Sequence, residues 1–492
     1  MRLSGLLDAL QDWCGLVPPA GGQDVNPVLT GVCSDSRQIV PGDLFLALPG
    51  LTSDGMDYAS EAVSRGARVV LGMAPGSEKV PYLIPKGSLS LAELAGQVAH
   101  VLTGRPSDSL FVLGVTGTNG KTTVVHLVHQ ALEAASIPTG RCGTLGRFFR
   151  GINHAQNLTT PPVDTLHAWF SEVVQAGGRA VALEASSHGL SQCRLAGVSM
   201  DAAGWTNFTQ DHLDYHSDIT SYAKAKARLI HALPAGSPAF IPRGEDQIFA
   251  PCQGASAEII PWGLGDSAPL RGKVKFHAEG LILTIGGSWG GGEIRSSLVG
   301  RHNAENLLLA WGLLRSVGLS EEEASRGLSD ATSPVGRLER ICADSNRFLY
   351  VDYAHTPAAL EEVLAAIRAS HPSRQLGLVF GAGGDRDSLK RFPMGVAAAQ
   401  GADWCIVTTD NARMESPGSI AETVADGVRS CGVEPLVELD RRSAIRMGLK
   451  KTAPGDVLVI AGKGHETWQD VGGVRFPFSD KVELEEAAGC LT

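Results

Sequence analysis

The chain has 492 residues, of which 43% are hydrophobic and 19% are charged, and its formal net charge is −10. This composition is typical of a globular protein with ample core, and the length favours about three domains. The acidic balance argues against a general nucleic-acid or membrane-surface binder, and we see neither an apolar run long enough to span a membrane nor the start of a signal peptide. The nine cysteines have no C-x-x-C or zinc-ligand spacing, which predicts reduced thiols in a cytoplasmic protein.

The first segment, residues 1–104, is predicted to form a small α/β domain. Its pattern includes a helix over residues 58–67 that ends at Gly66. Strand pieces are expected around this helix at 32–37, 42–50 and 68–72.

The second segment, residues 105–332, begins with an apolar strand at 110–113, the run GVTGTNGKTT at 114–123 and a helix at 124–132. A glycine-rich turn at a helix N-terminus attracts phosphate through its N–H groups and the helix dipole. Lys121 would pair with the phosphates, and Thr122 would offer its hydroxyl to Mg²⁺. The glycine spacing departs from the standard phosphate loop, because Val115 stands where that motif has its first glycine. The alternative is a glycine-rich turn that holds no ligand.

Two further strands of this segment are predicted at 179–187 and 202–207. Ligands of open α/β sheets collect at the carboxyl ends of the strands, so Glu184 and His212 are candidates to join Thr122 at a Mg²⁺ ion. The alternative is that Glu184 is only a polar strand end and His212 a capping or core histidine. A β-rich insert is expected around 280–285.

A helix is predicted at 222–230, and it carries Lys224, Lys226 and Arg228. A charged helix face is usually only solvated, and this is the default interpretation of Lys224.

The third segment, residues 333–492, has a second α/β pattern with strands at 348–352, 376–380, 404–409 and 456–460. Each strand ends in a polar or glycine-rich turn. Four side chains on these turns could clamp a zwitterionic or dicarboxylic amino acid, namely Arg386, Asp410, Asn411 and Arg413. Arginine suits this role because its guanidinium pairs with carboxylates in a bidentate manner. The alternative is a surface salt-bridge cluster of little energetic value.

These motifs resemble those of the Mur ligase family, and within it the MurE type, over nearly the whole length of the chain. The loop GVTGTNGKT at 114–122 has the form that these ligases share. Further motifs of the resemblance are DSR at 35–37, PGDLF at 41–45, NLTTP at 157–161, EASSH at 184–188, DHLDYH at 211–216 and YAHTP at 353–357. GGDRD at 383–387 and GKGHE at 462–466 separate the MurE type from its relatives.

The resemblance implies an α/β protein with the three-domain Mur ligase architecture. It implies a UDP-binding N-terminal domain at 1–104, a central ATP-binding domain at 105–332 with a P-loop ATPase-like parallel sheet, and a Rossmann-like amino-acid-binding domain at 333–492. The implied activity is that of an ATP-dependent ligase of peptidoglycan precursor synthesis. It adds meso-2,6-diaminopimelate to UDP-N-acetylmuramoyl-L-alanyl-D-glutamate through an acyl phosphate, with ATP and Mg²⁺, as a cytoplasmic monomer that binds neither nucleic acid nor membrane.

The resemblance also assigns roles to residues. Lys121, Lys226, Glu184 and His212 are the implied catalytic residues, and the implied metal ligands are Thr122, Glu184, His212 and Lys226, the last as a carbamate. ATP would contact Gly117, Thr118, Asn119, Gly120, Lys121, Thr122, Thr123, Asn306, Arg337, Asp352 and His355. The nucleotide-sugar dipeptide would contact Ser34, Ser36, Leu51, Thr52, Ser53, Asn157, Thr159, Thr160, Ser186, Gln192 and Arg194.

Diaminopimelate would contact Arg386, Asp410, Asn411, Ala412, Arg413, Gly462 and Glu466. Enzymes of the family that use this amino acid carry Asp-Asn-Pro-Arg, whose arginine meets the distal carboxylate, and here the run is DNAR at 410–413. Alanine does not fix the turn as proline does. Alternatives that stay open are the lysine-adding ligase of the same family, a folylpolyglutamate synthetase, and a nucleotide-dependent switch without ligase activity.

Overall fold

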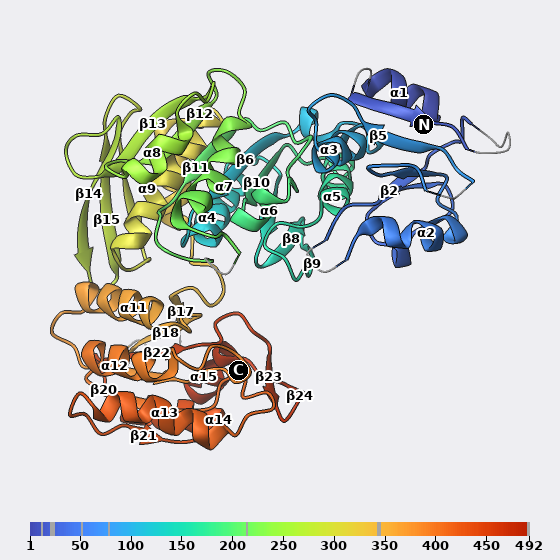
Figure 1. Cartoon of the computed structure of the whole chain (residues 1–492). Coiled ribbons are helices and arrows are strands. Elements are labelled where there is room, and N and C mark those ends of the chain that lie inside the picture. Colours follow the sequence, from blue (N-terminus) through green and yellow to red (C-terminus); the bar gives the residue numbers. More distant parts are fainter. Residues whose placement is uncertain are drawn as a thin grey trace. The chain divides into compact units, whose positions relative to one another are not determined.

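The computed structural model describes residues 1–10, 13–19, 25–50, 53–76, 79–212, 215–341 and 346–489. The chain divides into two compact units, and Figure 1 labels the helices and strands of each. One consists of Met1–Trp262 with Leu309–Ser320, and the other of Gly263–Leu308 with Glu321–Thr492. No helix in these ranges is long and apolar enough to cross a membrane.

The first unit starts with a five-stranded sheet. Its strands lie in the order β1 (Cys14–Val17), β5 (Tyr82–Pro85), β4 (Val69–Leu71), β3 (Asp43–Leu46) and β2 (Gly31–Cys33). Side chains alternate between the two faces of a strand, so Leu44 and Leu46 pack under α1 (Leu3–Leu10) and α3 (Leu91–Leu102). Phe45 packs on the opposite face against α2 (Ala59–Arg65). The predicted helix end at Gly66 is confirmed, since Gly66 caps α2 with a left-handed φ of 114°.

The central sheet of this unit is parallel through six strands, in the order β13 (Glu258–Leu264), β12 (Pro238–Pro242), β11 (Ala202–Trp205), β6 (Phe111–Thr116), β10 (Ala180–Glu184) and β7 (Thr139–Gly143). β8 (Gly146–Phe149) and β9 (Ile152–His154) continue it in antiparallel fashion. The associated helices are α4 (Lys121–Ala134), α5 (Val163–Gln175), α6 (Ser187–Ser191), α7 (Ile219–His231) and α8 (Asp246–Cys252).

β6 is longer than the predicted strand at 110–113. It continues to Thr116 because Gly114 and Val115 pair with β10 on one side and β11 on the other. The helix after the loop also starts earlier than predicted, at Lys121. The phosphate-loop motif therefore lies directly between a central strand and a helix.

The second unit contains the predicted β-rich insert, an antiparallel set of β14 (Leu270–His277), β15 (Gly280–Gly286) and β16 (Gly292–Ser296). α10 (Glu321–Asp330) lies against β16. The helix α9 (Arg301–Ser316) has its first residues in this unit.

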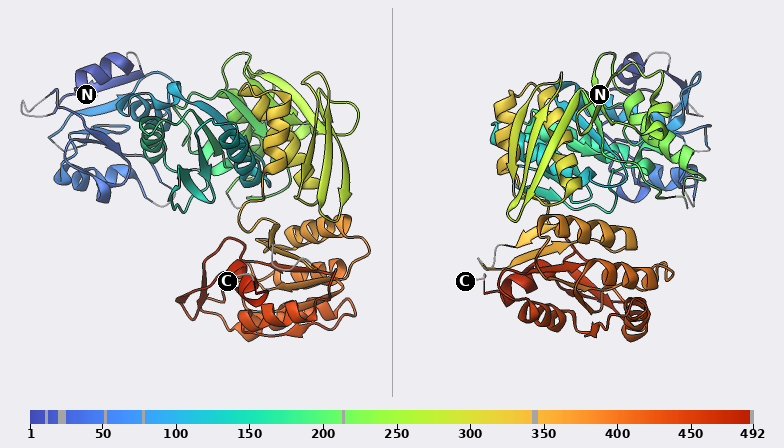
Figure 2. Two further views of the ribbon diagram at one scale, coloured as in Figure 1. Left: turned by 180° about the vertical axis from the view of Figure 1, so that it is seen from behind. Right: turned by 90° about the vertical axis from the view of Figure 1, so that its left-hand side faces the viewer.

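The same unit holds a six-stranded sheet in the order β17 (Glu339–Ile341), β18 (Phe348–Asp352), β22 (Val457–Ala461), β19 (Leu376–Phe380), β20 (Trp404–Val407) and β21 (Leu436–Val437). All neighbours except β17 and β18 are parallel. One face packs on α11 (Pro357–Ser370), α12 (Arg391–Gly401) and α13 (Pro417–Arg429), and the other on α14 (Arg441–Lys451) and α15 (Asp480–Ala487) (Figure 2).

This parallel arrangement decides where the polar turns of the segment lie. The turns after β18, β19, β20 and β22 leave the same edge of the sheet, as the sequence predicts. A hairpin of β23 (Trp468–Val471) and β24 (Val474–Pro477) follows the turn after β22.

Candidate active site

The turn after β6 has the backbone of a phosphate-binding loop. Gly117 and Gly120 have φ angles of 139° and 82°, which side chains other than glycine rarely adopt. A Cβ atom on Gly117 would lie 1.8 Å from Oγ1 of Thr206. Gly120 is the N-cap of the 14-residue helix α4, so the positive end of the helix dipole is directed at this turn.

The segment after β11 holds the turn in place. The main-chain nitrogens of Thr118 and Asn119 donate to the main-chain oxygen and the Oδ1 of Asn207, at 3.1 and 2.9 Å. The hydroxyl of Thr206 donates to the oxygen of Asn119 at 2.5 Å. The loop is thus fixed by contacts from the neighbouring strand end.

Two lysines meet at one oxygen of this turn. Lys121 Nζ donates to the main-chain oxygens of Gly117 and Thr118, at 2.8 Å each. Lys226, on α7 and only 1% exposed, donates to the same Gly117 oxygen at 2.7 Å. Burial, together with the nearby charge of Lys121, lowers the pKa of Lys226 well below its usual value. Lys226 Nζ also lies 4.4 Å from the ring centre of Tyr222.

Glu184 ends β10 and is 2% exposed. Its Oε2 accepts a hydrogen bond from the Thr122 hydroxyl at 3.0 Å. Thr144 donates to the same carboxylate through its nitrogen, at 2.8 Å, and its hydroxyl, at 3.2 Å. The structure therefore brings the predicted pair of Thr122 and Glu184 together, and their oxygens are the donor type that Mg²⁺ prefers.

His212 lies beside His188 and Tyr222. Its ring centre is 4.9 Å from that of His188 and 6.3 Å from that of Tyr222, and its Nε2 is 3.6 Å from the Asp211 carboxylate. In the ranges that the structure describes, no three or more His, Cys, Asp or Glu side chains are grouped to hold a metal ion. The role of His212 at a metal stays a prediction.

Four of the residues expected at the nucleotide-sugar dipeptide form one hydrogen-bonded set. Thr160 Oγ1 lies 3.0 Å from Ser186 Oγ. Arg194 donates to the oxygen of Thr160 at 2.7 Å and to Oε1 of Gln192 at 2.6 Å. Arg194 is half-buried.

The other residues expected at this substrate are less closely joined. Thr159 Oγ1 lies 3.3 Å from Thr144 Oγ1, and Asn157 is exposed. Ser34 donates to Asp164 through its nitrogen, at 2.7 Å, and its hydroxyl, at 3.0 Å, while Ser36 donates to Glu61 at 2.7 Å. Ser53 is exposed, and the predictions for Leu51 and Thr52 lie outside the described residues.

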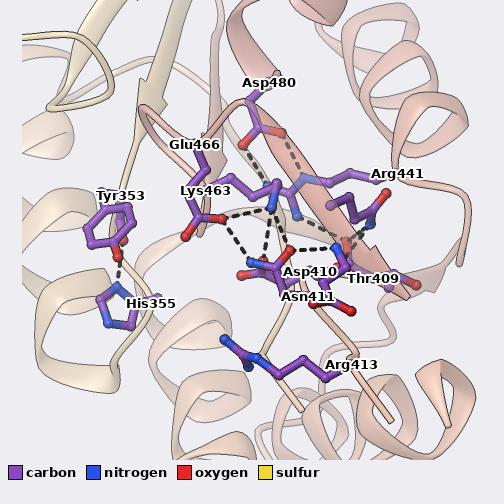
Figure 3. Close-up of polar contacts among 12 residues, drawn as sticks. Tyr353, His355, Thr409, Asp410, Asn411, Arg413, Arg441, Lys463, Glu466 and Asp480 are labelled. Atoms are coloured by element: carbon purple, nitrogen blue, oxygen red, sulfur yellow. Dashed lines mark hydrogen bonds and ion pairs between the residues drawn. The ribbon is translucent and has the colours of Figure 1, made fainter. Parts of the chain in front are cut away.

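In the second unit, the turns after β20 and β22 build a buried polar cluster (Figure 3). Lys463 is completely buried, and its Nζ donates to Asn411 Oδ1 at 3.0 Å and to Glu466 Oε2 at 2.9 Å. Its distance to Asp410 Oδ1 is 3.6 Å. The amide nitrogen of Asn411 donates to Glu466 Oε2 at 2.8 Å. Three predicted site residues thus surround one lysine.

A second buried ion pair supports this cluster. Arg441 on α14 binds Asp480 at the start of α15 in a bidentate manner, at 2.7 and 2.8 Å. Both side chains are completely buried. Arg441 also donates to the main-chain oxygen of Ala461 at 2.8 Å, so it holds the end of β22 from which Lys463 follows.

The turn that carries Arg413 is fixed on both sides, although Ala412 replaces the proline of the family motif. Asn411 accepts from Gly384 at 2.8 Å, and the nitrogen of Arg413 donates to the oxygen of Asp470 at 3.0 Å. Arg413 has a φ of 51°, and its guanidinium donates to the oxygen of Gly384 at 2.5 Å. Ala412 is completely buried.

Arg386 and Gly462 complete the residues expected at the amino acid. Arg386 is exposed. Gly462 has a φ of 118°, and a Cβ atom there would lie 2.9 Å from Oδ2 of Asp410. This close approach explains a glycine at the start of the turn that leads to Lys463.

Of the residues expected at the adenosine or the phosphates in this unit, Asp352 ends β18 and His355 follows it. Asp352 is buried and accepts from the nitrogens of Leu338 and Ala354, at 2.7 Å each. Burial raises the pKa of Asp352 and lowers that of His355, whose Nδ1 donates to the oxygen of Tyr353 at 2.9 Å.

Two more residues belong to this group. Arg337 lies 4.8 Å over the Tyr353 ring, and the buried Asn306 donates to Asn303 at 3.2 Å.

Sequence reasoning missed three side chains that the structure places at these sites. Lys463 lies within the GKGHE motif, but a lysine in a loop is ordinarily expected to be exposed to solvent. Thr144 directly follows the short strand β7, and no sequence motif marks it as a site residue. Tyr222 lies four residues before Lys226, and the sequence resemblance uses this spacing to identify Lys226, but the contact of the two side chains was not predicted.

Comparison with known proteins assigns the chain to a family. The model of the Mur ligase middle domain matches residues 115–314, that of the Mur ligase, glutamate ligase domain matches 336–464, and that of the Mur ligase family, catalytic domain matches 28–92. A relative from Chromobacterium violaceum, named UDP-N-acetylmuramoyl-L-alanyl-D-glutamate--2,6-diaminopimelate ligase, is 38% identical and covers 98% of this chain and 98% of its own length. The chain belongs to the Mur ligase family.

Other members with the same name agree. A Mur ligase from Ectopseudomonas mendocina is 40% identical over 92% of this chain and 93% of its own length. A solved structure of that name superimposes with a TM-score of 0.70 at 31% identity, and covers 94% of this chain and 95% of the other. The α/β fold with the three-domain Mur ligase architecture is confirmed, and the protein is an enzyme, an ATP-dependent ligase.

Proposed function

We propose that this Mur ligase joins meso-2,6-diaminopimelate to UDP-N-acetylmuramoyl-L-alanyl-D-glutamate in peptidoglycan precursor synthesis. The observation that carries the proposal is the likeness, over 92% of the chain or more, to curated ligases named for this reaction. ATP supplies the phosphoryl group that activates the substrate carboxylate, and Mg²⁺ supplies counter-charge to the phosphates. The residues of the chain bind and orient the reacting groups.

The phosphate loop is the proposed site of the triphosphate. Gly117 to Thr123 wrap the phosphates, and Lys121 pairs with them. Thr122 and Glu184, which lie 3.0 Å apart, offer oxygens to Mg²⁺, with His212 as a further ligand. Asn306, Arg337, Asp352 and His355 are proposed at the adenosine or the phosphates.

Lys226 is proposed to carry a carbamate that ligates a second Mg²⁺. A neutral amine adds to CO₂ and forms an N–C bond with the loss of one proton, whereas an ammonium does not react. Support comes from the burial of Lys226 and from its lowered pKa, since both favour the neutral amine.

The substrate with the nucleotide sugar is proposed to lie along the first unit. Its uridine would contact Ser34, Ser36 and the segment 51–53. Its muramoyl dipeptide and diphosphate would contact Asn157, Thr159, Thr160, Ser186, Gln192 and Arg194. The hydrogen bonds among Thr160, Ser186, Gln192 and Arg194 support a common site for this second group.

The amino acid is proposed to bind at the carboxyl edge of the six-stranded sheet. Arg413 and Arg386 would meet the distal carboxylate and Glu466 an ammonium group, with Asp410, Asn411, Ala412 and Gly462 shaping the pocket. A lysine-adding ligase would have no carboxylate for Arg413, so this arginine favours diaminopimelate.

The domain boundaries 1–104, 105–332 and 333–492 are part of the proposal, and each family match lies within one of these ranges. So are a monomeric state, a cytoplasmic location, and the absence of nucleic-acid or membrane partners. Every cysteine in the described part of the chain is a free thiol, in accord with a reducing compartment.

The test is ADP release by the purified enzyme with UDP-N-acetylmuramoyl-L-alanyl-D-glutamate and ATP. We expect release that depends on meso-diaminopimelate, with little on addition of L-lysine and none without an amino acid. ADP release that no amino acid stimulates would favour a nucleotide-dependent switch, and stimulation by lysine alone would favour the lysine-adding ligase.

A further inference from the structure

Lys463 is a cation that the proposed reaction does not use directly, and it is completely buried. Burying an ammonium is strongly unfavourable unless it is paired and hydrogen-bonded. Lys463 Nζ donates to Asn411 Oδ1 at 3.0 Å and to Glu466 Oε2 at 2.9 Å. It lies 3.6 Å from Asp410 Oδ1 and 5.5 Å from the centre of the Trp468 ring. Its three polar partners are all residues proposed to contact the amino acid.

The contacts of Lys463 decide the orientation of the Asn411 side chain. Oδ1 of Asn411 accepts from Lys463 Nζ and from the nitrogen of Asp470, each at 3.0 Å. An amide with two donors on its oxygen must direct its NH₂ group to the other side. That group donates to Glu466 Oε2 at 2.8 Å. The ammonium of Lys463 and the main-chain nitrogen of Asp470 therefore together select one of the two possible amide orientations.

The same contacts give the two carboxylate oxygens of Glu466 different roles. Oε2 is taken up by Lys463 and Asn411 (Figure 3). Oε1 makes no hydrogen bond to any side chain or main-chain group of the described residues. Because Oε2 is saturated by the protein, Oε1 is the atom that remains for an ammonium group of a ligand.

We propose that Lys463 is a positioning residue of the amino-acid site, which acts through Glu466 and Asn411 without touching the substrate. The proposal rests on the proposed function. The ion pair of Arg441 and Asp480 holds the end of β22, and this fixes the main chain from which the Lys463 side chain extends. Lys463 pairs with Glu466 and lies near Asp410, while Arg441 pairs with Asp480, so each of the two buried cations has a carboxylate partner within the protein.

The alternative is that Lys463 serves only the stability of this unit. A buried ion pair replaced by apolar groups is often neutral for stability, so unfolding data alone would not separate the two roles. A positioning role predicts a selective rise of one KM, whereas a purely structural role predicts a parallel loss for all substrates.

The first experiment measures KM for meso-diaminopimelate, ATP and the nucleotide-sugar dipeptide with wild type and Lys463→Met. Methionine has a similar length and no charge. Hydrogen bonds to charged groups contribute enough for a rise of roughly 30-fold in KM for diaminopimelate. We expect KM for the other two substrates to change less than about threefold. Lys450→Met, at an exposed lysine of α14, is the matched control and should leave all three values unchanged.

The second experiment is a double-mutant cycle with Glu466→Gln. If Lys463 acts through Glu466, Lys463→Met should raise KM for diaminopimelate by less than about threefold in the Glu466→Gln background. The double variant removes the charge of both partners, the buried Lys463 and the partly exposed Glu466, so we expect it to serve as the comparison if Lys463→Met alone unfolds.

Three results would overturn the inference: an unchanged KM for diaminopimelate in folded Lys463→Met, an equal rise of all three KM values, or the same rise in both backgrounds. A failure of the proposed function would be recognised by a different result, because the wild-type enzyme would then release no ADP in response to diaminopimelate.

Discussion

Lys226 Nζ lies 2.7 Å from the main-chain oxygen of Gly117, the residue whose left-handed φ opens the phosphate loop. The lysine that we propose as a carbamate is thus anchored on the phosphate loop itself. Burial is the main cause of its lowered pKa, and the charge of Lys121 at the same oxygen adds to it.

We expect Lys226→Ala to lower kcat by about a hundredfold or more, the loss typical of one preorganised electrostatic group. Added bicarbonate should not restore the variant, because no amine remains to react. In wild type, ¹³C-labelled bicarbonate should give a carbamate signal in ¹³C NMR that Lys226→Ala lacks. Lys224→Ala is the control, since Lys224 is exposed on the same helix. Damage by Lys224→Ala together with full activity of Lys226→Ala would refute the assignment.

A second prediction concerns Lys121. Its charge and its place at the start of α4 make it the proposed partner of the phosphates. Lys121→Ala should lose roughly a thousandfold or more in kcat, because phosphoryl transfer depends on charge stabilisation. Circular dichroism should show an intact fold. Near-normal ADP release by the folded variant would contradict the role of the loop.

The fold was largely predictable from the sequence, because buried parallel strands are short apolar runs and their polar turns follow at one edge. The strands β18, β19 and β22 agree with the prediction to within one residue at each end. β20 ends at Val407 and not at Thr409, since pairing with β19 and β21 goes no further. Strand ends depend on the neighbouring strands, which the local sequence does not encode.

The candidate site was predictable where a motif fixes local geometry. Gly117, Gly120 and Lys121 belong to one turn, and Thr122 with Glu184 follows from two adjacent parallel strands. Lys463 was missed because its burial comes from β20, β22 and α14 packing together. Glu466 is only three residues away, but Asp410 and Asn411 lie more than fifty residues earlier in the chain, so no local window shows the full set of partners.

The third prediction concerns stability against pH. His167 on α5 is completely buried, and burial lowers its pKa from 6.5 to about 4. Its Nε2 donates to the oxygen of Ala196 at 2.9 Å. Between pH 6.5 and 4 the unfolded chain binds the proton more readily than the folded chain. Folding stability should therefore fall as the pH decreases through this window, by about 3 kcal/mol for this group.

His167→Gln keeps an N–H donor for Ala196 and removes the titration. Urea unfolding at several pH values should show a shallower loss of stability below pH 6.5 for the variant than for wild type. Equal slopes would show that His167 does not titrate differently in the two states.

The last prediction concerns the choice of amino acid. Lysine and meso-diaminopimelate share one end and differ by a distal carboxylate. Arg413 has five N–H donors, of which NH1 donates to the oxygen of Gly384, and a distal carboxylate would give this guanidinium a bidentate partner. When lysine is bound, the same pocket leaves the Arg413 charge without an anionic partner. Discrimination of roughly a thousandfold is within reach of such a site.

The buried Ala412 does not weaken this expectation, because hydrogen bonds from Gly384 and to Asp470 fix the turn that a proline would otherwise restrain. We expect wild type to favour diaminopimelate in kcat/KM, and Arg413→Ala to lose most of that preference by losing activity on diaminopimelate. Arg413→Lys should recover only part of it, since an ammonium lacks the planar fork of a guanidinium. Equal use of both amino acids by wild type would refute the specificity and leave the ligase assignment standing.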